Sequence, residues 1–197
     1  MLNIIVAWMA EARPLVDHFR LEPLSKKYGF RIYRNAEVNL IVCGQGRAAA
    51  AAGTAWLQAR VPAEENGVWL NVGIAGHRDL AIGSAIVGNL VRDGDSGRWW
   101  RLPLRSEEAM TAKEIITVGQ PDLDYATDAV VDMEASAFVE TALRFAERDA
   151  IGCLKVISDN AGQPASALTP ARASELVGAQ IDAIASLAAA MERQHAG

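Results

Sequence analysis

The chain alternates between short apolar runs and longer stretches in which apolar residues recur at helical spacing. Most of the apolar runs lack alternating polar residues, which is typical of strands covered on both faces of a sheet. They occupy residues 3–8, 38–43, 68–73, 84–91, 115–118, 128–132 and 151–158. A weaker, alternating run at 30–34 predicts an edge or half-exposed strand. Helical spacing predicts helices near 10–20, 47–60, 133–147 and 170–193.

The order of these elements predicts the fold class. Strands alternate with helices along the chain, which is typical of a sheet with helices on both faces. We therefore expect an α/β protein with three layers, in which a central mixed, mostly parallel sheet is flanked by helices. With 197 residues, the chain is long enough to bury one substantial core, and we expect a single domain over 1–197.

The last predicted helix, 170–193, has clear signals at its start. Thr169 can cap it, and Pro170 suits its first turn. Its apolar stripe consists of Val177, Ile181, Ile184, Ala188 and Met191. Such a stripe predicts packing against the core rather than a binding function.

Residues 94–111 form the least regular part of the chain and contain the adjacent Trp99 and Trp100. A buried anchor for a loop is the simplest interpretation of this pair. A lid that faces the substrate and a contact between subunits are the alternatives.

Composition excludes several classes of partner. The formal net charge is −5 at pH 7, and no basic cluster is longer than Lys26-Lys27, whereas nucleic acids and anionic membranes are bound through basic patches. We therefore expect no nucleic acid and no membrane as partner. The first apolar run lacks preceding basic residues and predicts a strand rather than a signal peptide, and no run approaches the roughly 20 apolar residues of a membrane span.

Cysteines and histidines give no sign of a metal or redox site. Cys43 and Cys153 lie within apolar runs far apart in the sequence, and buried, reduced thiols in a cytoplasmic protein are the expected interpretation. The three histidines are scattered, and no CxxC or HExxH spacing is present. The sequence therefore predicts no metal site.

A glycine-rich turn, VCGQGRAAAAAG at 42–53, joins a predicted strand to a predicted helix. Read as GxGxxA, it is similar to a dinucleotide-binding turn, which requires an acidic residue at the end of the next strand. That strand ends in Gly73 and Ile74 instead, and no GK[ST] follows the turn, so neither NAD nor a P-loop is expected. What remains is a tight strand–helix connection near some ligand.

Two further strand ends carry candidate site residues. Gly73, Gly76 and Gly83 flank one of them, where glycines let a ligand approach backbone amides, although ordinary turns are an equally simple interpretation. The apolar run 151–158 leads directly into Asp159. An acid at the carboxyl end of a buried strand lies where open α/β sheets bind ligands, or else it caps a short turn.

The segment AVVDMEASAF, 129–138, places two acids at a strand–helix junction. Asp132 is expected to cap a helix that begins at Met133. Glu134 then falls in the first turn, where the helix dipole favours a carboxylate, and this is the simplest interpretation of Glu134. Glu134 begins the apolar face that continues with Phe138, so it should point inward, where a carboxylate needs partners. An ionised carboxylate accepts two hydrogen bonds side by side, which matches the vicinal diol of a ribose.

Four of these segments together resemble the nucleoside phosphorylase and nucleosidase superfamily. VVDMEASAF resembles the signature V-[DE]-M-E-[AST]-x-A, and NVGIAG, with Gly83 further on, resembles N-T-G-x-A-G-G. KVISDNA resembles R-x-I-S-D-x-A, and CGQGRAAAAAGTAWL resembles S-G-I-G-K-x-x-A-A. The resemblance is greatest to the methylthioadenosine/S-adenosylhomocysteine nucleosidases and their relatives.

The resemblance implies an enzyme that cleaves the N-glycosidic bond of a purine nucleoside or 5′-thionucleoside through an oxocarbenium-like state. Asp159 would donate a proton or hydrogen bond to N7 of the departing purine. Glu134 would hold the ribose hydroxyls, and Met133 would pack against the sugar. The other residues implied in substrate binding are Ile74, Ala75, Gly76, Ile157 and Ser158.

The chain departs from the family pattern where water is activated. Hydrolytic members carry AMEEE after the first strand; here the segment is AWMAEA, so Ala12 replaces the last Glu and Glu11 is the candidate for its role. Phosphorolytic members have arginines where this chain has Glu11 and Asn71, and a carboxylate repels phosphate. Hydrolysis without a cofactor is therefore favoured. Phosphorolysis, with phosphate as co-substrate bound by Arg47 and Arg13, is the alternative.

The chain is also shorter than typical members, and the loss falls around 94–128, where the family builds part of its base and sugar pocket. The segment ITVGQPDLDY, 116–125, is a candidate remnant of that pocket. A catalytically weak nucleoside-binding protein is the alternative from another functional class. Because family members form dimers or hexamers, the resemblance implies a homodimer or higher homo-oligomer, with Trp99 and Trp100 as candidate contact residues.

Overall fold

The computed structural model describes residues 1–24, 29–60, 67–103, 110–121 and 124–195. The helices are α1 (Met9–Phe19), α2 (Arg47–Gln58), α3 (Ala135–Ala142), α4 (Pro170–Ala179) and α5 (Ile181–His195). The strands are β1 (Leu2–Val6), β2 (Glu22–Pro23), β3 (Arg31–Arg34), β4 (Val38–Val42), β5 (Val68–Gly76), β6 (Ala85–Asp93), β7 (Trp99–Arg101), β8 (Thr111–Thr117), β9 (Val130–Asp132) and β10 (Ile151–Asp159).

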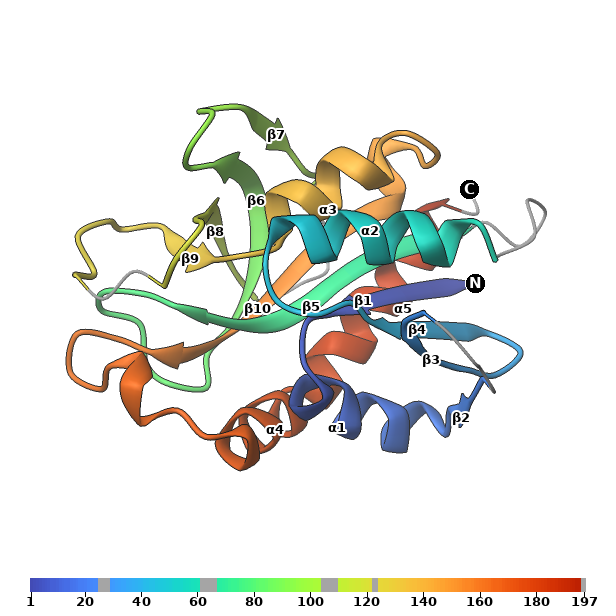
Figure 1. Cartoon of the computed structure of the whole chain (residues 1–197), viewed down its shortest axis with the longest axis horizontal. Helices are drawn as coiled ribbons and strands as arrows, with labels where there is room; N and C mark the ends of the chain where they lie inside the picture. Colours follow the sequence, from blue (N-terminus) through green and yellow to red (C-terminus); the bar gives the residue numbers. More distant parts are fainter. Residues whose placement is uncertain (25–28, 61–66, 104–109, 122–123, 196–197) are drawn as a thin grey trace.

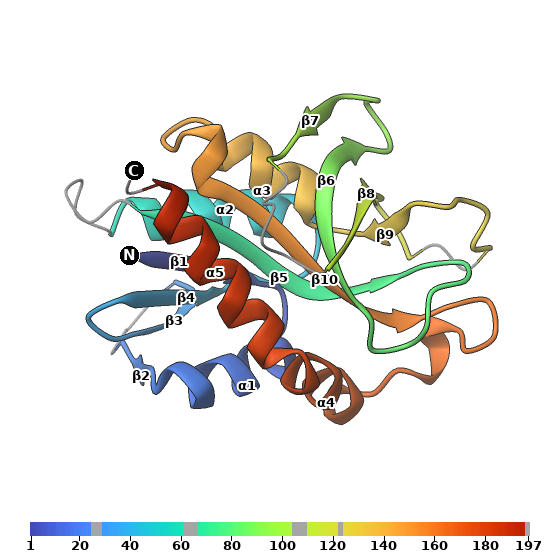
Figure 2. The same cartoon turned by 180° about the vertical axis from the view of Figure 1, so that it is seen from behind.

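The three-layer α/β fold predicted from the sequence is confirmed. Helices α1, α4 and α5 cover one face of the sheet, and α2 and α3 cover the other (Figures 1 and 2). The strand order is β10–β6–β8–β9–β5–β1–β4–β3–β2, with β7 added to β6. The long pairings from β4 through β1 and β5 to β10 are parallel, whereas β2 and β3 join antiparallel at the edge. The sheet is therefore mixed, as expected.

One part of the sheet closes on itself. Strand β5 pairs with β10 and, through Gly76 and Val131, also with β9, so that β5, β10, β6, β8 and β9 form a ring. The parallel strands β1, β4, β5 and β10 bring their carboxyl ends to one edge. Closure of the ring carries the junction between β9 and α3 to that same edge, and this is where the candidate site lies.

The core has one apolar cluster on each face of the sheet. Most of the stripe predicted along the C-terminal helical segment lies in the cluster under α1, α4 and α5: Val177, Ile184, Ala188 and Met191. Both cysteines are free and buried, as expected. Within the described ranges, no helix combines the length and apolar character that a membrane crossing requires.

Two predicted helices differ from the observed ones. The predicted helix 170–193 is two helices, because the chain turns at Gln180, whose side-chain Nε2 donates a hydrogen bond to the carbonyl of Gly83 (2.7 Å). The predicted helix 133–147 is shorter and begins at Ala135 rather than Met133. Its first N–H groups are bound by the Asp132 side chain, which holds the two residues before it outside the helix.

Strand β7 lies inside the segment 94–111, for which no regular structure was expected. It spans three residues and pairs antiparallel with β6. A strand this short carries too few positions for an alternating pattern to be recognised.

Candidate active site

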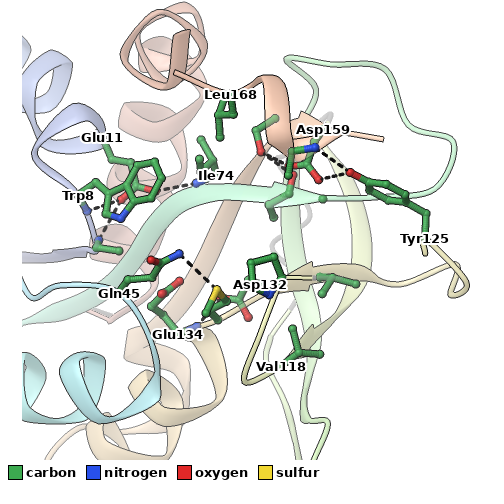
Figure 3. Close-up of a pocket in the computed structure, with 18 residues that line it drawn as sticks. Trp8, Glu11, Gln45, Ile74, Val118, Tyr125, Asp132, Glu134, Asp159 and Leu168 are labelled. Carbon is green, nitrogen blue, oxygen red and sulfur yellow. Dashed lines mark hydrogen bonds between the residues drawn. The ribbon is translucent and has the colours of Figure 1, made fainter. Parts of the chain in front are cut away.

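A cavity of about 210 Å³ lies at the carboxyl edge of the sheet. Its lining comes from the start of α1 and the β1–α1 connection, the β4–α2 turn, the ends of β5 and β10, the β8–β9 connection, the β9–α3 junction and the segment between β10 and α4. Asp159 and Tyr125 lie toward one end of it, and Glu11, Gln45 and Glu134 lie toward the other (Figure 3). Apolar side chains fill most of the remaining wall, so the carboxylates face a partly water-excluded space.

Asp159 is the last residue of β10, and its side chain is buried. The pairing of β10 with β5 shifts register between Ile157 and Asp159, and this bulge lets both Ser158 and Asp159 reach the cavity. The hydroxyl of Ser158 donates to Oδ1, and the hydroxyl of Tyr125 donates to Oδ2 over 2.8 Å. A β-carbon at Gly76 would lie 2.6 Å from Oδ2, so a glycine is needed there for the carboxylate to fit.

Glu134 directly precedes α3 and is 7 % exposed. Its Oε1 accepts a hydrogen bond of 2.7 Å from the N–H of Gly46, in the glycine-rich turn before α2. Burial raises the pKa of Glu134 to about 7, while attraction to Lys155 lowers it and repulsion from Asp132 raises it. The carboxyl group therefore gains and loses its proton near neutral pH.

Asp132 binds N–H groups at the start of α3, although the N-cap position is Glu134 and not Asp132 as expected, and it also forms a buried ion pair. Its Oδ2 accepts hydrogen bonds from the N–H groups of Glu134 (3.2 Å) and Ala135 (2.8 Å), and its Oδ1 accepts one from Thr117 Oγ1 (2.6 Å). Nζ of Lys155 lies 2.7 Å from Oδ2, and the two side chains are 1 % and 0 % exposed. Burial alone would lower the pKa of Lys155, but attraction to Asp132 and Glu134 outweighs it and raises this pKa.

Glu11 lies in the first turn of α1 and is buried. Its Oε2 accepts hydrogen bonds from the N–H groups of Ala7 (3.0 Å) and Trp8 (2.8 Å), and its Oε1 accepts one from Ile74 (3.0 Å). A β-carbon at Gly73 would lie only 3.0 Å from Oε1. Burial raises the pKa of Glu11, although these hydrogen bonds lower it. Three donors among the described residues leave one of about four lone-pair directions of the carboxylate for a ligand or water.

The other residues expected at the site divide into those that line the cavity and those that do not. Five line it: Ile74, Ala75, Gly76, Met133 and Ser158. Ile157 does not match the expectation, because its side chain is fully buried in the apolar cluster on the α2–α3 face. Ala12 is likewise fully buried in the core, so α1 turns Glu11 rather than residue 12 toward the cavity.

Neither of the two candidate anion-binding arginines is among the described residues that line the cavity. Arg47 is paired with two carboxylates: its Nε lies 3.2 Å from Asp93 Oδ2, and its Nη1 lies 2.6 Å from Asp95 Oδ2. Arg13 is exposed on α1. A phosphate ion would have to compete with both acids for Arg47.

Among the cavity residues that received no individual role from the sequence, Trp8, Gln45 and Tyr125 have polar or aromatic side chains. Trp8 lies between β1 and α1, and Gln45 lies in the glycine-rich turn after β4, where its amide Nε2 is 3.3 Å from the sulfur of Met133. Both follow parallel strands, so their place at the carboxyl edge was available as a signal. Tyr125 ends the segment ITVGQPDLDY, 116–125, which the family resemblance marks as a candidate remnant of the pocket, but no periodicity there indicates which side chain faces a ligand.

Neither a protein-family model nor a curated relative matches the sequence. Solved structures do match it. A Helicobacter pylori methylthioadenosine nucleosidase variant with 5′-methylthioadenosine in its active site has a TM-score of 0.76 at 15 % identity, over 94 % of this chain and 96 % of that one. The Colwellia psychrerythraea 5′-methylthioadenosine/S-adenosylhomocysteine nucleosidase in complex with adenine has a TM-score of 0.73 at 20 % identity, over 98 % of this chain and 95 % of that one. The chain has the fold of these nucleosidases.

The nucleosidase fold is shared with further enzymes of this group. The Arabidopsis thaliana 5′-methylthioadenosine nucleosidase has a TM-score of 0.76 at 17 % identity, over 95 % of this chain and 93 % of that one. The futalosine hydrolase of Helicobacter pylori has a TM-score of 0.67 at 14 % identity, over 92 % of this chain and 97 % of that one. At these identities the likeness establishes the fold, and the function has to be argued from the side chains of the cavity.

Proposed function

We propose that this protein is an enzyme of the nucleoside phosphorylase and nucleosidase superfamily that hydrolyses the N-glycosidic bond of a purine nucleoside or 5′-thionucleoside. The observation that supports this most is the presence of Glu134 and Asp159 toward opposite ends of one cavity (Figure 3). The carboxyl groups suit the two parts of a nucleoside, a sugar diol and a purine nitrogen. The methylthioadenosine and adenine bound by proteins of the same fold support a purine as the base.

In the proposed reaction, the bond between C1′ of the ribose and N9 of the purine breaks, and its electron pair stays with the base. Asp159 transfers a proton to N7, which neutralises the departing base. Glu134, in its ionised form, accepts hydrogen bonds from the 2′- and 3′-hydroxyls and fixes the sugar. Glu11 holds a water molecule at C1′ and accepts a proton from it as the new C–O bond forms. No cofactor takes part.

Water suits this cavity better than phosphate. Besides Asp159, the acidic residues Glu11 and Glu134 line it, and a phosphate placed beside their carboxylates would be repelled. The candidate anion-binding residue Arg47 is already paired with two carboxylates, and Lys155 is paired with Asp132. Phosphorolysis is the alternative reaction. A nucleoside-binding protein with little turnover is the alternative from another functional class. It would fit the proposal that the chain is a single domain shortened around 94–128, where part of the pocket would be lost.

One assay separates the three. The protein is incubated with methylthioadenosine, S-adenosylhomocysteine, adenosine or inosine, with and without phosphate, and the free base is measured by chromatography. Release without phosphate is the expected result. Release that requires phosphate would establish phosphorolysis instead. Binding by calorimetry without release from any substrate would leave only the nucleoside-binding function.

The titration of Glu134 predicts a pH dependence of substrate affinity. Because its pKa is raised to about 7, Glu134 is mostly protonated at pH 6 and mostly ionised at pH 8. Only the ionised form offers both oxygens to the diol. KM for adenosine should therefore fall by up to about tenfold between these pH values, in proportion to the ionised fraction. Initial rates at several substrate concentrations and pH values measure it.

Glu134→Gln is the matched variant for this prediction, since glutamine has the same shape but does not titrate. It should raise KM and remove the change in KM between pH 6 and pH 8. With 2′,3′-dideoxyadenosine, which lacks both hydroxyls, the variant and the wild-type protein should bind with equal affinity. An unchanged KM and kcat for adenosine in the variant would remove Glu134 from the substrate site.

We also propose that the protein is a homo-oligomer of the cytoplasm. Trp99 supports the first part, because it is 60 % exposed on the short strand β7, and large exposed aromatic side chains are enriched at protein interfaces. The two free, buried cysteines are typical of a reducing compartment. Sedimentation equilibrium of the full chain should give a dimer or larger species, and a monomer at all concentrations would contradict the proposal.

A further inference from the structure

Tyr125 joins three segments of the chain at the Asp159 end of the cavity. It lies in the connection between β8 and β9, and its side chain is 7 % exposed. Its hydroxyl donates to Asp159 Oδ2 (2.8 Å) and accepts a hydrogen bond from the N–H of Ala165 (3.1 Å), in the short 3₁₀ turn Ala165–Ala167. One oxygen therefore ties the β8–β9 connection to the end of β10 and to the turn that follows it.

The backbone of Tyr125 shows that this placement is enforced. Its φ is +49°, in the left-handed region that non-glycine residues with large side chains rarely adopt. Such conformations persist where the surrounding contacts determine them, and they are concentrated at functional sites. The ring also packs closely, because a β-carbon at Gly76 would lie 3.5 Å from Cε1 of the tyrosine. The strained backbone, the buried ring and the doubly bonded hydroxyl all direct this side chain to Asp159.

We propose that Tyr125 is a positioning residue for Asp159. The inference rests on the proposed function, in which Asp159 protonates the departing base. The hydroxyl of Ser158 holds one oxygen of the carboxyl group and the hydroxyl of Tyr125 holds the other. A carboxyl group held at both oxygens cannot rotate about its Cβ–Cγ bond without losing a hydrogen bond.

This restraint has a direct use in the reaction. A carboxyl oxygen that accepts one hydrogen bond keeps a second position, which can carry the proton that Asp159 transfers to N7 while both hydroxyls hold the group. A displacement of a catalytic group by about 1 Å can cost a factor of about 10² in rate. The hydroxyl of Tyr125 thus sets the direction of proton transfer without touching the substrate's reacting bond.

Tyr125→Phe tests the assignment, because it removes the hydroxyl and keeps the ring. We expect kcat for a cleaved nucleoside to fall by about tenfold or more, because the carboxyl group is no longer held in line with N7, with a much smaller change in KM. In the Asp159→Asn background the same change should have little further effect, because the group that the hydroxyl positions is already lost. Tyr33→Phe is the matched control. Tyr33 lies in strand β3, and among the described residues its hydroxyl forms a hydrogen bond only with the sulfur of Met9 (3.6 Å).

Affinity for free adenine, measured by calorimetry on the same four proteins of the cycle, provides a second readout that needs no turnover. Tyr125→Phe should weaken adenine binding in the wild-type background and not in the Asp159→Asn background. The assignment is wrong if Tyr125→Phe lowers kcat and adenine affinity by the same factors in both backgrounds. It is also wrong if Tyr125→Phe lowers them in neither background. If the wild-type protein cleaves no nucleoside, the proposed function fails, and the adenine cycle alone still decides whether Tyr125 positions Asp159. All measurements are made well below the unfolding temperature of each variant.

Discussion

Replacing Asp159 with Asn is expected to lower kcat for a purine nucleoside by about 10²- to 10⁴-fold, the usual contribution of a positioned general acid. Asparagine keeps the shape of the side chain and can still form hydrogen bonds with the hydroxyls of Ser158 and Tyr125. It has no proton to transfer to N7. KM should change less than kcat, because the lost interaction strengthens only as the glycosidic bond breaks. Steady-state kinetics measure both constants.

Two controls separate loss of the acid from loss of the fold. Asp182→Asn removes an exposed carboxylate of α5 and should leave kcat unchanged. Nitrophenyl riboside provides the chemical control, since nitrophenolate leaves without protonation, and its cleavage should be nearly unaffected in Asp159→Asn. Circular dichroism and thermal unfolding of the variant should match the wild-type protein. Turnover of a purine nucleoside at close to the wild-type rate in Asp159→Asn would contradict the assigned role.

The sequence predicted where the site lies because the site is built on strand ends. Continuous apolar runs located the central strands, and the parallel arrangement implied that residues after those strands would meet at one edge. Asp159 and Glu134 both line the cavity at this edge. Their roles in the reaction stay predictions until the variants are measured.

The sequence did not predict which side chains turn toward the cavity within each segment. Simple alternation would put only one of Ser158 and Asp159 there, whereas the bulge in β10 admits both and leaves Ile157 in the core. The choice between Glu11 and Ala12 depends in the same way on how α1 packs against the sheet. Such rotations are decided by tertiary contacts of the whole layer and leave no trace in a local pattern.

Tyr125 and Lys155 show two different limits. Tyr125 reaches Asp159 through an irregular connection and a left-handed backbone, which periodicity does not describe. Lys155 did leave a signal, because it is a charged residue inside the apolar run 151–158. A lysine in a strand that is covered on both faces requires a carboxylate partner. That partner is Asp132, one of the two acids in the segment 129–138.

The buried ion pair gives the second large prediction, on stability. Lys155→Met keeps the aliphatic part of the side chain but leaves the Asp132 carboxylate buried without its counter-charge. Breaking a buried pair in this way costs about 3–5 kcal/mol of the free energy of unfolding. The hydrogen bonds to Asp132 from Thr117 and from the start of α3 remain, so we expect a loss near the lower limit. Urea unfolding of the variant and the wild-type protein measures it.

The variants that keep or remove both charges decide whether the ion pair is the cause. Lys155→Arg keeps the positive charge and should lose much less stability than Lys155→Met. The double variant Lys155→Met/Asp132→Asn should be more stable than Lys155→Met alone, because no unpaired charge remains buried. If the double variant is no more stable than Lys155→Met, packing of the long side chain, and not charge, explains the loss.

The same substitution should change substrate binding through Glu134. Attraction to Lys155 lowers the pKa of Glu134 against the effect of burial, so its removal raises that pKa further above 7. The ionised form that accepts the ribose hydroxyls then appears only at higher pH. The fall in KM for adenosine should accordingly move to higher pH in Lys155→Met and stay in place in Lys155→Arg. An unchanged pH profile in a folded Lys155→Met protein would show that Lys155 stabilises the fold without tuning Glu134.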